Sequence, residues 1–347
     1  MHENVYLNGE IVPADRASVS VWDAGFLHGA SAFTTMLVRC GRVFRLDRHL
    51  NRLFDTVSLL NLRTDATPDS LAAAVGRVIE ANGLGGASES CGTPKSGGTP
   101  KSSWGCLGGR AQPGHPQADL GVPQDLGAPP LEARMRITLT PGSVRDIGRT
   151  GGTPVVQERI GTTLITIEPE AAYIPQWRRE GITVVLAAFK QLAGDPTFGY
   201  KTGCYLPRIL ARQEAAIKGA QEALWFTTDN HLAEACFRNV FLVSEGKVFT
   251  PPRDTPVLPG VVREAVIELC GQLQIPCEID TPLTIRDLLG ADEVFLTGSG
   301  LGVCPVVRVE RHGVGDEKPG GVTKKIMDAY EGLLRTECPQ VPCRNDQ

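Results

Sequence analysis

One segment of the chain, residues 84–130, limits what the rest of the sequence can fold into. Its 47 residues include 11 glycines and 7 prolines, and a near-repeat, GTPKSG followed by GTPKSS, occupies residues 92–103. Glycine and proline above about 25–30% are typical of low-complexity sequence. With so few apolar side chains, the segment cannot bury enough surface to offset the entropy lost on ordering. We predict a disordered insertion here.

The residues on either side predict that this segment interrupts a domain rather than joining two. Before it, Leu71, Val75 and Val78 recur at helical spacing. After it, residues 133–141 alternate between apolar and polar side chains as in a strand. A helix and the strand that follows it are normally joined by a short loop. The insertion is therefore expected inside one domain.

The remaining sequence alternates strand-like and helix-like segments. We expect strands at residues 4–7, 33–39, 42–45, 134–140, 162–168, 181–189, 222–228, 239–243, 246–249 and 293–297. We expect helices at residues 47–60, 69–82, 204–218, 260–274, 284–289 and 321–335. This mixture, without a regular βαβ repeat, predicts a mixed α/β (α+β) fold. An irregular stretch between Pro169 and Pro175 indicates a break, which gives an N-terminal domain of residues 1–177 that carries the insertion and a C-terminal domain of residues 178–347.

Composition and charge exclude several classes of protein. With 35 Lys and Arg against 39 Asp and Glu, the chain lacks the basic excess of a nucleic-acid-binding protein. No apolar run reaches the roughly 18–20 residues of a membrane span, and the N-terminus lacks the apolar core of a signal peptide. The ten cysteines form no CxxC pair and the six histidines show no metal-ligand spacing. We expect free thiols in a cytoplasmic protein without a metal site.

One lysine has an unusual position. No GxGxxG, GxxxxGK[ST] or GxSxG motif is present, so hydride and phosphoryl transfer have no motif in support. Lys201, in Tyr200-Lys201-Thr202-Gly203, lies between an apolar strand and the helix expected at residues 204–218. A desolvated lysine there would have a lowered pKa and a free amine for Schiff-base chemistry. The alternative is a lysine whose stem packs while its ammonium group reaches water.

Three other segments could meet an anion or a cation. A Pro-Gly turn precedes the helix expected at residues 260–274, so the amides of residues 261 and 262 could hold a phosphate. The strand expected at residues 293–297 runs into a Gly-Ser-Gly loop at 298–300, and Glu234 lies in a turn before another strand. Each of these features alone is more often structural than functional.

Taken in order along the chain, these segments resemble the class IV (fold-type IV) pyridoxal-phosphate aminotransferases. The resemblance rests on five ordered blocks: YLNGEIVPADRASVSVWDAGFLHGASAFTTMLV with HLNRL, YKTGCYLPRILARQEA, LAEACFRNVFLV, LPGVVRE and DEVFLTGSGLGVCPV. It covers nearly the whole chain except residues 84–130. It implies a small N-terminal and a larger C-terminal domain. The family includes branched-chain aminotransferases, D-amino acid aminotransferases and aminodeoxychorismate lyases.

The resemblance implies a role for each matching residue. Lys201 is similar to the lysine that bonds covalently to the cofactor and later moves a proton in a ping-pong reaction, and Glu234 to the carboxylate that faces the pyridine nitrogen. Tyr205 is similar to the tyrosine at the phenolic oxygen, and Arg52 to the phosphate-binding arginine. The rest of the expected phosphate site comprises the amides of Val261 and Val262 and the hydroxyl of Ser299. The family commonly has threonine at position 262, so valine loses one hydroxyl.

The matching residues identify the substrate less clearly than they identify the cofactor. Phe33 matches an aromatic residue that lines the side-chain pocket in branched-chain enzymes, and Arg136 matches a basic position found in both branched-chain enzymes and lyases. The amides of Ser299 and Gly300 could hold the substrate carboxylate. Pro141 stands where D-amino acid enzymes commonly have an arginine, which disfavours that activity. We expect amino transfer from a hydrophobic or branched-chain L-amino acid to a 2-oxo acid.

Two other activities on the same scaffold remain open, namely aminodeoxychorismate lyase and D-amino acid transaminase. Thr34 and Thr35 resemble the lyases, and Arg134 replaces a tyrosine that often accompanies the basic position at 136. A non-catalytic binding protein is disfavoured because Lys201, Glu234 and Arg52 are all present. The family also implies a homodimer in which each subunit contributes to its neighbour's site, with small-molecule substrates and neither nucleic acid nor membrane as partners.

Overall fold

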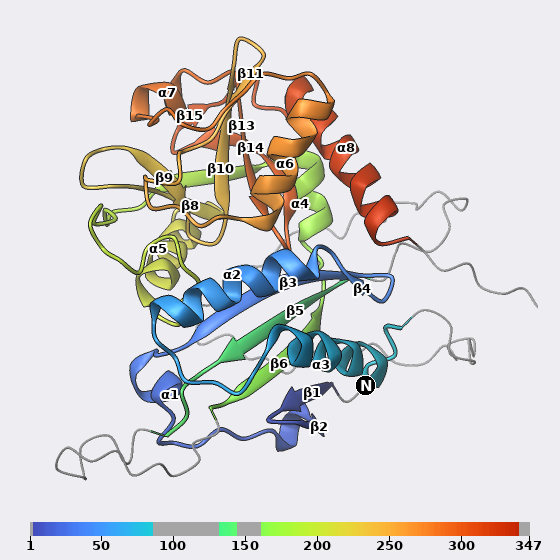
Figure 1. Cartoon of the computed structure of the whole chain (residues 1–347). Helices are drawn as coiled ribbons and strands as arrows, with labels where there is room; N and C mark the ends of the chain where they lie inside the picture. Colours follow the sequence, from blue (N-terminus) through green and yellow to red (C-terminus); the bar gives the residue numbers. More distant parts are fainter. Residues whose placement is uncertain (1–2, 86–131, 144–160, 340–347) are drawn as a thin grey trace, which may run out of the picture.

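The computed structural model describes residues 3–85, 132–143 and 161–339 (Figure 1). The insertion predicted at 84–130 lies outside these residues, apart from Leu84 and Gly85. Two sheets carry the fold, which is the mixed α/β arrangement predicted from the sequence. None of the described helices is long and apolar enough to cross a membrane.

The first sheet has six strands in the order β2-β1-β6-β5-β3-β4. Its strands are β1 (Asn4–Leu7), β2 (Glu10–Pro13), β3 (Ala32–Arg39), β4 (Arg42–Val43), β5 (Glu132–Leu139) and β6 (Thr163–Pro169). All neighbouring strands run antiparallel. A short 3₁₀ helix, η1 (Ala14–Arg16), and helix α1 (Ala24–His28) precede β3. The sheet therefore brings β3 and β5 together near its centre.

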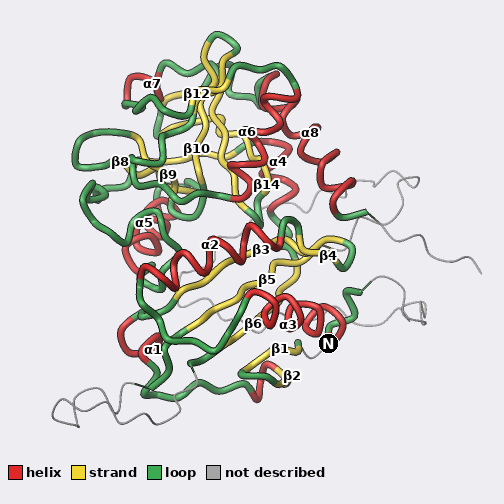
Figure 2. Tube along the Cα trace, in the orientation of Figure 1, coloured by secondary structure: helices red, strands yellow, loops and turns green. Residues whose placement is uncertain are grey.

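Helices α2 (Leu46–Leu59) and α3 (Pro68–Ala81) pack side by side against this sheet (Figure 2). The apolar residues predicted for one face of α3 are all buried: Leu71, Val75, Val78 and Ile79. Thr67 begins α3 with a capping box, and Pro68 occupies the first helical position, where its missing N–H costs nothing. Each buried Leu or Val contributes about 1.5–3 kcal/mol to stability.

The second sheet has nine strands, in the order β12-β11-β10-β13-β14-β7-β8-β9, with β15 beside β14. Its strands are β7 (Ile182–Leu186), β8 (Glu222–Phe226), β9 (Leu232–Ala235), β10 (Asn239–Ser244), β11 (Lys247–Phe249), β12 (Cys277–Glu278), β13 (Glu293–Gly298), β14 (Gly302–Val309) and β15 (His312–Gly313). Its helices are α4 (Ile174–Glu180), α5 (Leu206–Ile217), α6 (Val261–Gln272), α7 (Ile285–Leu289) and α8 (Gly321–Glu337). Helices α6 and α8 share one apolar core with β10 and β13.

Strand β14 and helix α4 of this half were not predicted from the sequence. Pro305 lies inside β14, and a proline normally argues against a central strand. Here pairing with β7 begins at the next residue, Val306, beside a bulge, so the missing N–H of Pro305 breaks no bond to β7. Residues 170–173 form no helix or strand, as predicted. Helix α4, which was not predicted, begins directly after them, and Pro175 lies in its first turn, where proline is tolerated. Short strands β2, β9, β12 and β15 were also missed.

Strands β10 and β11 form an antiparallel hairpin with a tight turn. Its two central residues are Glu245 and Gly246, with φ of 52° and 74°. Positive φ at both positions is typical of a type I′ turn, whose twist matches that of the strands. The strand expected at residues 246–249 therefore begins one residue later, at Lys247.

Candidate active site

One cavity of about 550 Å³ lies where the two sheets meet. All ten residues predicted to form a site line this cavity: Phe33, Arg52, Arg136, Lys201, Tyr205, Glu234, Val261, Val262, Ser299 and Gly300. They come from strands of both sheets, from the N-terminus of α6 and from the loops around them. The structure thus brings together segments that are almost 270 residues apart in sequence.

Lys201 lies in the loop before α5, and this loop pairs with the start of β3. Phe33 N–H donates to the carbonyl oxygen of Lys201 at 2.9 Å, and Gly203 N–H donates to that of Ser31 at 2.9 Å. A Cβ atom at Gly203 would lie 2.6 Å from the carbonyl oxygen of Gly29. Glycine is therefore required at position 203 by this close backbone approach, rather than as a flexible joint.

The side chain of Lys201 is buried against aromatic rings. Its Nζ lies 3.1 Å from the hydroxyl of Tyr205 and 4.9 Å from the centre of the Phe33 ring. Burial lowers the pKa of the Lys201 amine, and the nearby positive charge of Arg52 lowers it further. The amine is consequently neutral at lower pH than a surface lysine, which makes it a better nucleophile near neutrality.

Glu234, in β9, is held in one orientation from three directions. Arg208 Nη2 donates to its Oε1 at 2.6 Å, and Leu258 N–H donates to its Oε2 at 3.1 Å. Asn239 Nδ2 lies 3.4 Å from the same Oε2. The residue is only 4% exposed, and a carboxylate so deeply buried persists only when it is paired and hydrogen-bonded. Glu234 thus presents a fixed negative charge to the cavity.

Arg52 and the start of α6 form a positive corner. Arg52 Nη1 donates to the carbonyl oxygen of Pro259 at 3.2 Å, and Nη2 donates to Thr34 Oγ1 at 3.1 Å. Its Nε is buried and has no hydrogen-bond partner among the described residues. Burial lowers the pKa of this guanidinium to about 10, which still leaves it charged at neutral pH.

Helix α6 adds unpaired amides to the same corner. Its N-cap, Gly260, makes no side-chain capping bond, and the first amides of a helix have no partner within the helix. A Cβ atom at Gly260 would lie 2.0 Å from Asn239 Oδ1, so only glycine fits where α6 starts. Amides of Val261 and Val262, the positive end of the helix dipole and Arg52 together suit a phosphate or another anion.

The turn from Gly298 to Gly302 forms another wall of the cavity. It joins β13 to β14 and carries Ser299 and Gly300. Leu301 N–H donates to the carbonyl oxygen of Gly298 at 3.0 Å, which closes the turn. Thr297, just before it, has a buried hydroxyl without a hydrogen-bond partner in the described part of the chain. Thr297 is also among the residues that line the cavity.

The opposite wall comes from β3 and β5. The guanidinium carbon of Arg136 lies 3.7 Å from the centre of the Phe33 ring, and Phe33 meets Tyr205 edge to face at 5.0 Å. Arg134 Nη2 pairs with Glu168 Oε2 at 2.5 Å. Arg136 has no carboxylate partner among the described residues, so its charge remains available to an acidic ligand.

Sequence reasoning missed the residues that hold these groups. Arg208 and Asn239 clamp Glu234, while His49 and Thr34 surround Arg52. One signal was available: an arginine on the apolar helix that follows Lys201 suggests a buried partner. No spacing rule connects Arg208 to Glu234, which is 26 residues later.

The amino-acid sequence matches a known family. Residues 31–90 and 123–309 match the family model described as amino-transferase class IV. A putative branched-chain-amino-acid aminotransferase of Methanocaldococcus jannaschii is 26% identical over 95% of this chain and 96% of its own length. The branched-chain-amino-acid aminotransferase of Escherichia coli K12 is 27% identical over 96% of this chain and 93% of its own.

Solved structures share the fold. The crystal structure of the Escherichia coli branched-chain amino acid aminotransferase superposes with a TM-score of 0.76 at 25% identity, covering 100% of this chain and 99% of that one. The branched-chain aminotransferase of the archaeon Thermoproteus uzoniensis, solved with norvaline, has a TM-score of 0.73 at 22% identity, covering 98% and 96%. The two-sheet mixed α/β fold is therefore that of the Escherichia coli structure.

Proposed function

The chain belongs to the class IV family of pyridoxal-phosphate-dependent aminotransferases, and we propose that it moves the amino group of a hydrophobic L-amino acid, such as leucine, isoleucine or valine, to 2-oxoglutarate. The observation that carries the proposal is one cavity in which a buried lysine, a clamped carboxylate and an arginine beside a helix N-terminus meet. The naming of the relatives as branched-chain aminotransferases supports the substrate class.

The residues of the cavity fit pyridoxal phosphate. The buried, unpartnered Nε of Arg52 and the amides of Val261 and Val262 suit its phosphate, with the hydroxyl of Ser299 as a further donor. Glu234 suits its pyridine nitrogen. Valine at position 262 supplies an amide but no hydroxyl, so this site has one fewer bond than the threonine common in the family would allow. The loss corresponds to about 0.5–1.5 kcal/mol.

Each polar residue then has a defined task. Pyridoxal phosphate, when bound, supplies an aldehyde carbon that takes up amines and a ring that draws electrons from the substrate's α carbon. The neutral amine of Lys201 would hold the aldehyde carbon of the cofactor and, once the substrate's amino group takes its place, would carry the proton between the substrate's α carbon and C4′ of the cofactor. The hydroxyl of Tyr205, 3.1 Å from Nζ, orients that amine. Glu234, fixed by Arg208, keeps a proton on the ring nitrogen.

The walls of the cavity favour a transaminase with a compact substrate. Phe33 offers an apolar surface, and Arg136 together with the amides of Ser299 and Gly300 can receive carboxylates. A lyase acting on aminodeoxychorismate needs a second site for a ring carboxylate, but Arg134 is already paired with Glu168. Of the two threonines that resemble the lyases, Thr34 bonds Arg52 and does not line the cavity, whereas Thr35 does line it.

The proposal also includes a homodimer. Helices α1 and α5 expose large apolar side chains, among them Phe26 at 71% and Leu206 at 65%. The two helices are neighbours, because Cys204, two residues before α5, touches the carbonyl oxygen of Gly29 at 3.9 Å. An apolar face of this kind is typical of a protein–protein interface, and we propose that a second copy of the chain covers it.

A screen of amino donors tests the substrate assignment. The purified protein with bound cofactor is incubated with 2-oxoglutarate and each of leucine, isoleucine, valine, D-alanine or aminodeoxychorismate, and glutamate is measured. We expect glutamate from the branched-chain L-amino acids. Release of pyruvate and 4-aminobenzoate from aminodeoxychorismate without an oxo acid would favour the lyase. D-glutamate formed from D-alanine would favour the D-amino acid transaminase.

A further inference from the structure

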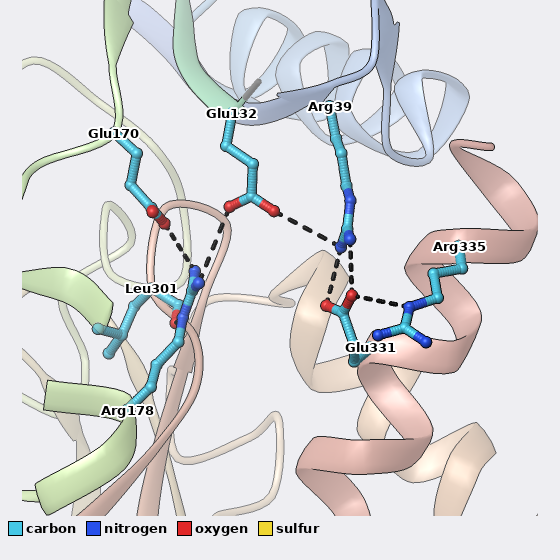
Figure 3. A network of polar contacts seen from close by, with 7 residues as sticks. All are labelled: Arg39, Glu132, Glu170, Arg178, Leu301, Glu331 and Arg335. Carbon is cyan, nitrogen blue, oxygen red and sulfur yellow. Dashed lines mark hydrogen bonds and ion pairs between the residues drawn. The ribbon is translucent and has the colours of Figure 1, made fainter. Parts of the chain in front are cut away.

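A chain of charged side chains joins the two sheets beside the cavity (Figure 3). It runs from Arg178 on α4 through Glu132, the first residue of β5, to Arg39 at the end of β3 and Glu331 on α8. Glu170 flanks Arg178. None of these residues belongs to the cofactor or substrate groups assigned above, so their arrangement needs another explanation.

Arg178 connects this chain of charges to the turn that carries Ser299 and Gly300. Its Nε donates to the carbonyl oxygen of Leu301 at 2.8 Å, while its Nη2 donates to Glu170 Oε1 at 2.9 Å. In Figure 3 the guanidinium lies between Leu301 and two carboxylates, those of Glu132 at the start of β5 and of Glu170 just after β6. One planar side chain therefore spans the gap between the cavity turn and the first sheet.

The carboxylates are anchored in turn. Glu132, with a side chain 11% exposed, lies 3.8 Å from Arg178 Nη1 and 3.5 Å from Arg39 Nη1. Arg39, whose side chain is 6% exposed, makes two hydrogen bonds to Glu331, at 2.8 and 2.6 Å. These ion pairs link Arg178 through Glu132 and Arg39 to α8, so they help to set where Arg178 holds Leu301.

The position of the turn matters because it faces β5 across the cavity. A Cβ atom at Gly300 would lie 3.5 Å from Arg134 Cδ, and β5 also carries Arg136. The contacts that hold the turn against the first sheet therefore set the distance from Ser299 and Gly300 to Arg134 and Arg136. Arg178 contacts both sides of that gap.

We propose that Arg178 is a positioning residue that fixes the Gly298–Leu301 turn against the first sheet, so that Ser299 and Gly300 hold phosphate and carboxylate groups in one place. The inference rests on the proposed function, because it assumes that this turn meets the cofactor or the substrate. Arg178 itself is not one of the groups assigned to the cofactor or substrate, and it acts on the turn through its hydrogen bond to the carbonyl oxygen of Leu301.

The test compares Arg178→Met with Arg179→Met, a matched control on the same helix. Both variants remove one arginine from α4. Arg179 is a suitable control because its side chain is 64% exposed and pairs with Glu180. Affinity for pyridoxal phosphate is measured on apo-protein by absorbance titration, without substrate. We expect Arg178→Met to weaken it about tenfold and to raise the KM for the amino donor similarly, with kcat within about threefold. Arg179→Met should match the wild type.

Two further variants distinguish positioning from general stability. Arg178→Lys keeps the charge but can reach only one partner well, so it should recover part of the affinity. Arg178→Met combined with Ser299→Ala should weaken cofactor binding less than the product of the single effects, because both act through one turn. Multiplicative effects in this double variant, or an Arg178→Met protein with the affinity and KM of the control, would overturn the inference.

If Arg178→Met does not fold, Glu170→Gln gives the same information by removing one anchor of the guanidinium. We expect a smaller loss of cofactor affinity in that variant, and wild-type affinity would count against the inference. The cofactor titration needs no substrate. A failed donor screen would thus reject the proposed substrate while leaving this result intact.

Discussion

Arg208 Nη2 lies 2.6 Å from Oε1 of Glu234, and the same guanidinium donates through Nη1 to the carbonyl oxygens of Ala235 and Cys236 at 3.0 Å each. Arg208 belongs to α5, which begins five residues after Lys201. One short segment therefore provides the lysine and also anchors the carboxylate that faces it across the cavity. Burial lowers the pKa of Arg208, but the Glu234 carboxylate raises it, with a net increase, so Arg208 stays charged.

Replacing Glu234 with glutamine should preserve cofactor binding but slow turnover at least 100-fold. A neutral amide cannot keep a proton on the ring nitrogen, so charge developing in the transition state is less stabilised. Stopped-flow rates of the half-reaction measure the effect. Glu214→Gln on α5, which removes only an exposed pair with Lys218, is the control. Wild-type turnover in Glu234→Gln would assign the ring nitrogen to another residue.

Lys201→Met should lose covalent attachment of the cofactor and nearly all activity, because no other amine among the described residues lines the cavity. Borohydride reduction followed by peptide mass spectrometry identifies the modified lysine in the wild type. Lys190→Met, which removes an exposed lysine bonded to Asn230, should keep both properties. Attachment that survives in Lys201→Met would refute the assignment.

His49 should make the protein sensitive to acid. Burial and the charges of Arg52 and Lys201 hold its pKa well below 6.5 in the folded state, whereas the unfolded chain takes up a proton near 6.5. Because the unfolded state binds more protons below that pH, stability falls as pH decreases, by up to about 1.4 kcal/mol per pH unit.

His49→Asn provides the comparison for this effect. Asparagine keeps an acceptor for Thr34 and Arg52, which His49 Nδ1 contacts at 3.1 and 3.2 Å, but it does not titrate. Urea unfolding of wild type and variant between pH 7 and pH 5 should show a steeper loss in the wild type. Parallel curves would mean that His49 is not the group responsible.

Sequence reasoning succeeded where the signal was local. The apolar spacing around Leu71 and Val78 predicted α3, and ordered motifs located the residues that line the cavity. It failed where the deciding contact is long-range: β14 tolerates Pro305 because of where its pairing with β7 begins. Arg178 likewise meets Leu301, 123 residues further on, and no periodicity encodes that contact.

Removing residues 86–130 should leave folding and activity close to those of the full chain. The composition of this segment predicts disorder, and insertions in surface loops cost little. A variant in which a short Gly-Ser linker joins Gly85 to the residue before β5 tests this, with limited proteolysis of the full chain beside it. Strong protection of the segment from protease, or loss of activity on its removal, would contradict the prediction.

The exposed face of α1 and α5 should be the dimer contact. On α5, Leu206, Ile209 and Leu210 are 65%, 43% and 44% exposed, and their i, i+3, i+4 spacing places them on one side of the helix. Phe26 and Leu27 of α1 add 71% and 43% exposed side chains. Removing such surface from water contributes about 25 cal/mol per Å², which favours association.

A glutamate in this face would lose its contact with water when a dimer forms, so it should prevent dimer formation. Leu206→Glu is therefore expected to sediment as a monomer at micromolar concentration, where the wild type sediments as a dimer. Leu289→Glu on α7 is the matched control, because Leu289 is also exposed, at 40%, but lies on another element. If each subunit completes its neighbour's site, Leu206→Glu should lose activity together with the dimer, while far-UV circular dichroism stays unchanged. A dimeric Leu206→Glu variant would mean that another face forms the contact.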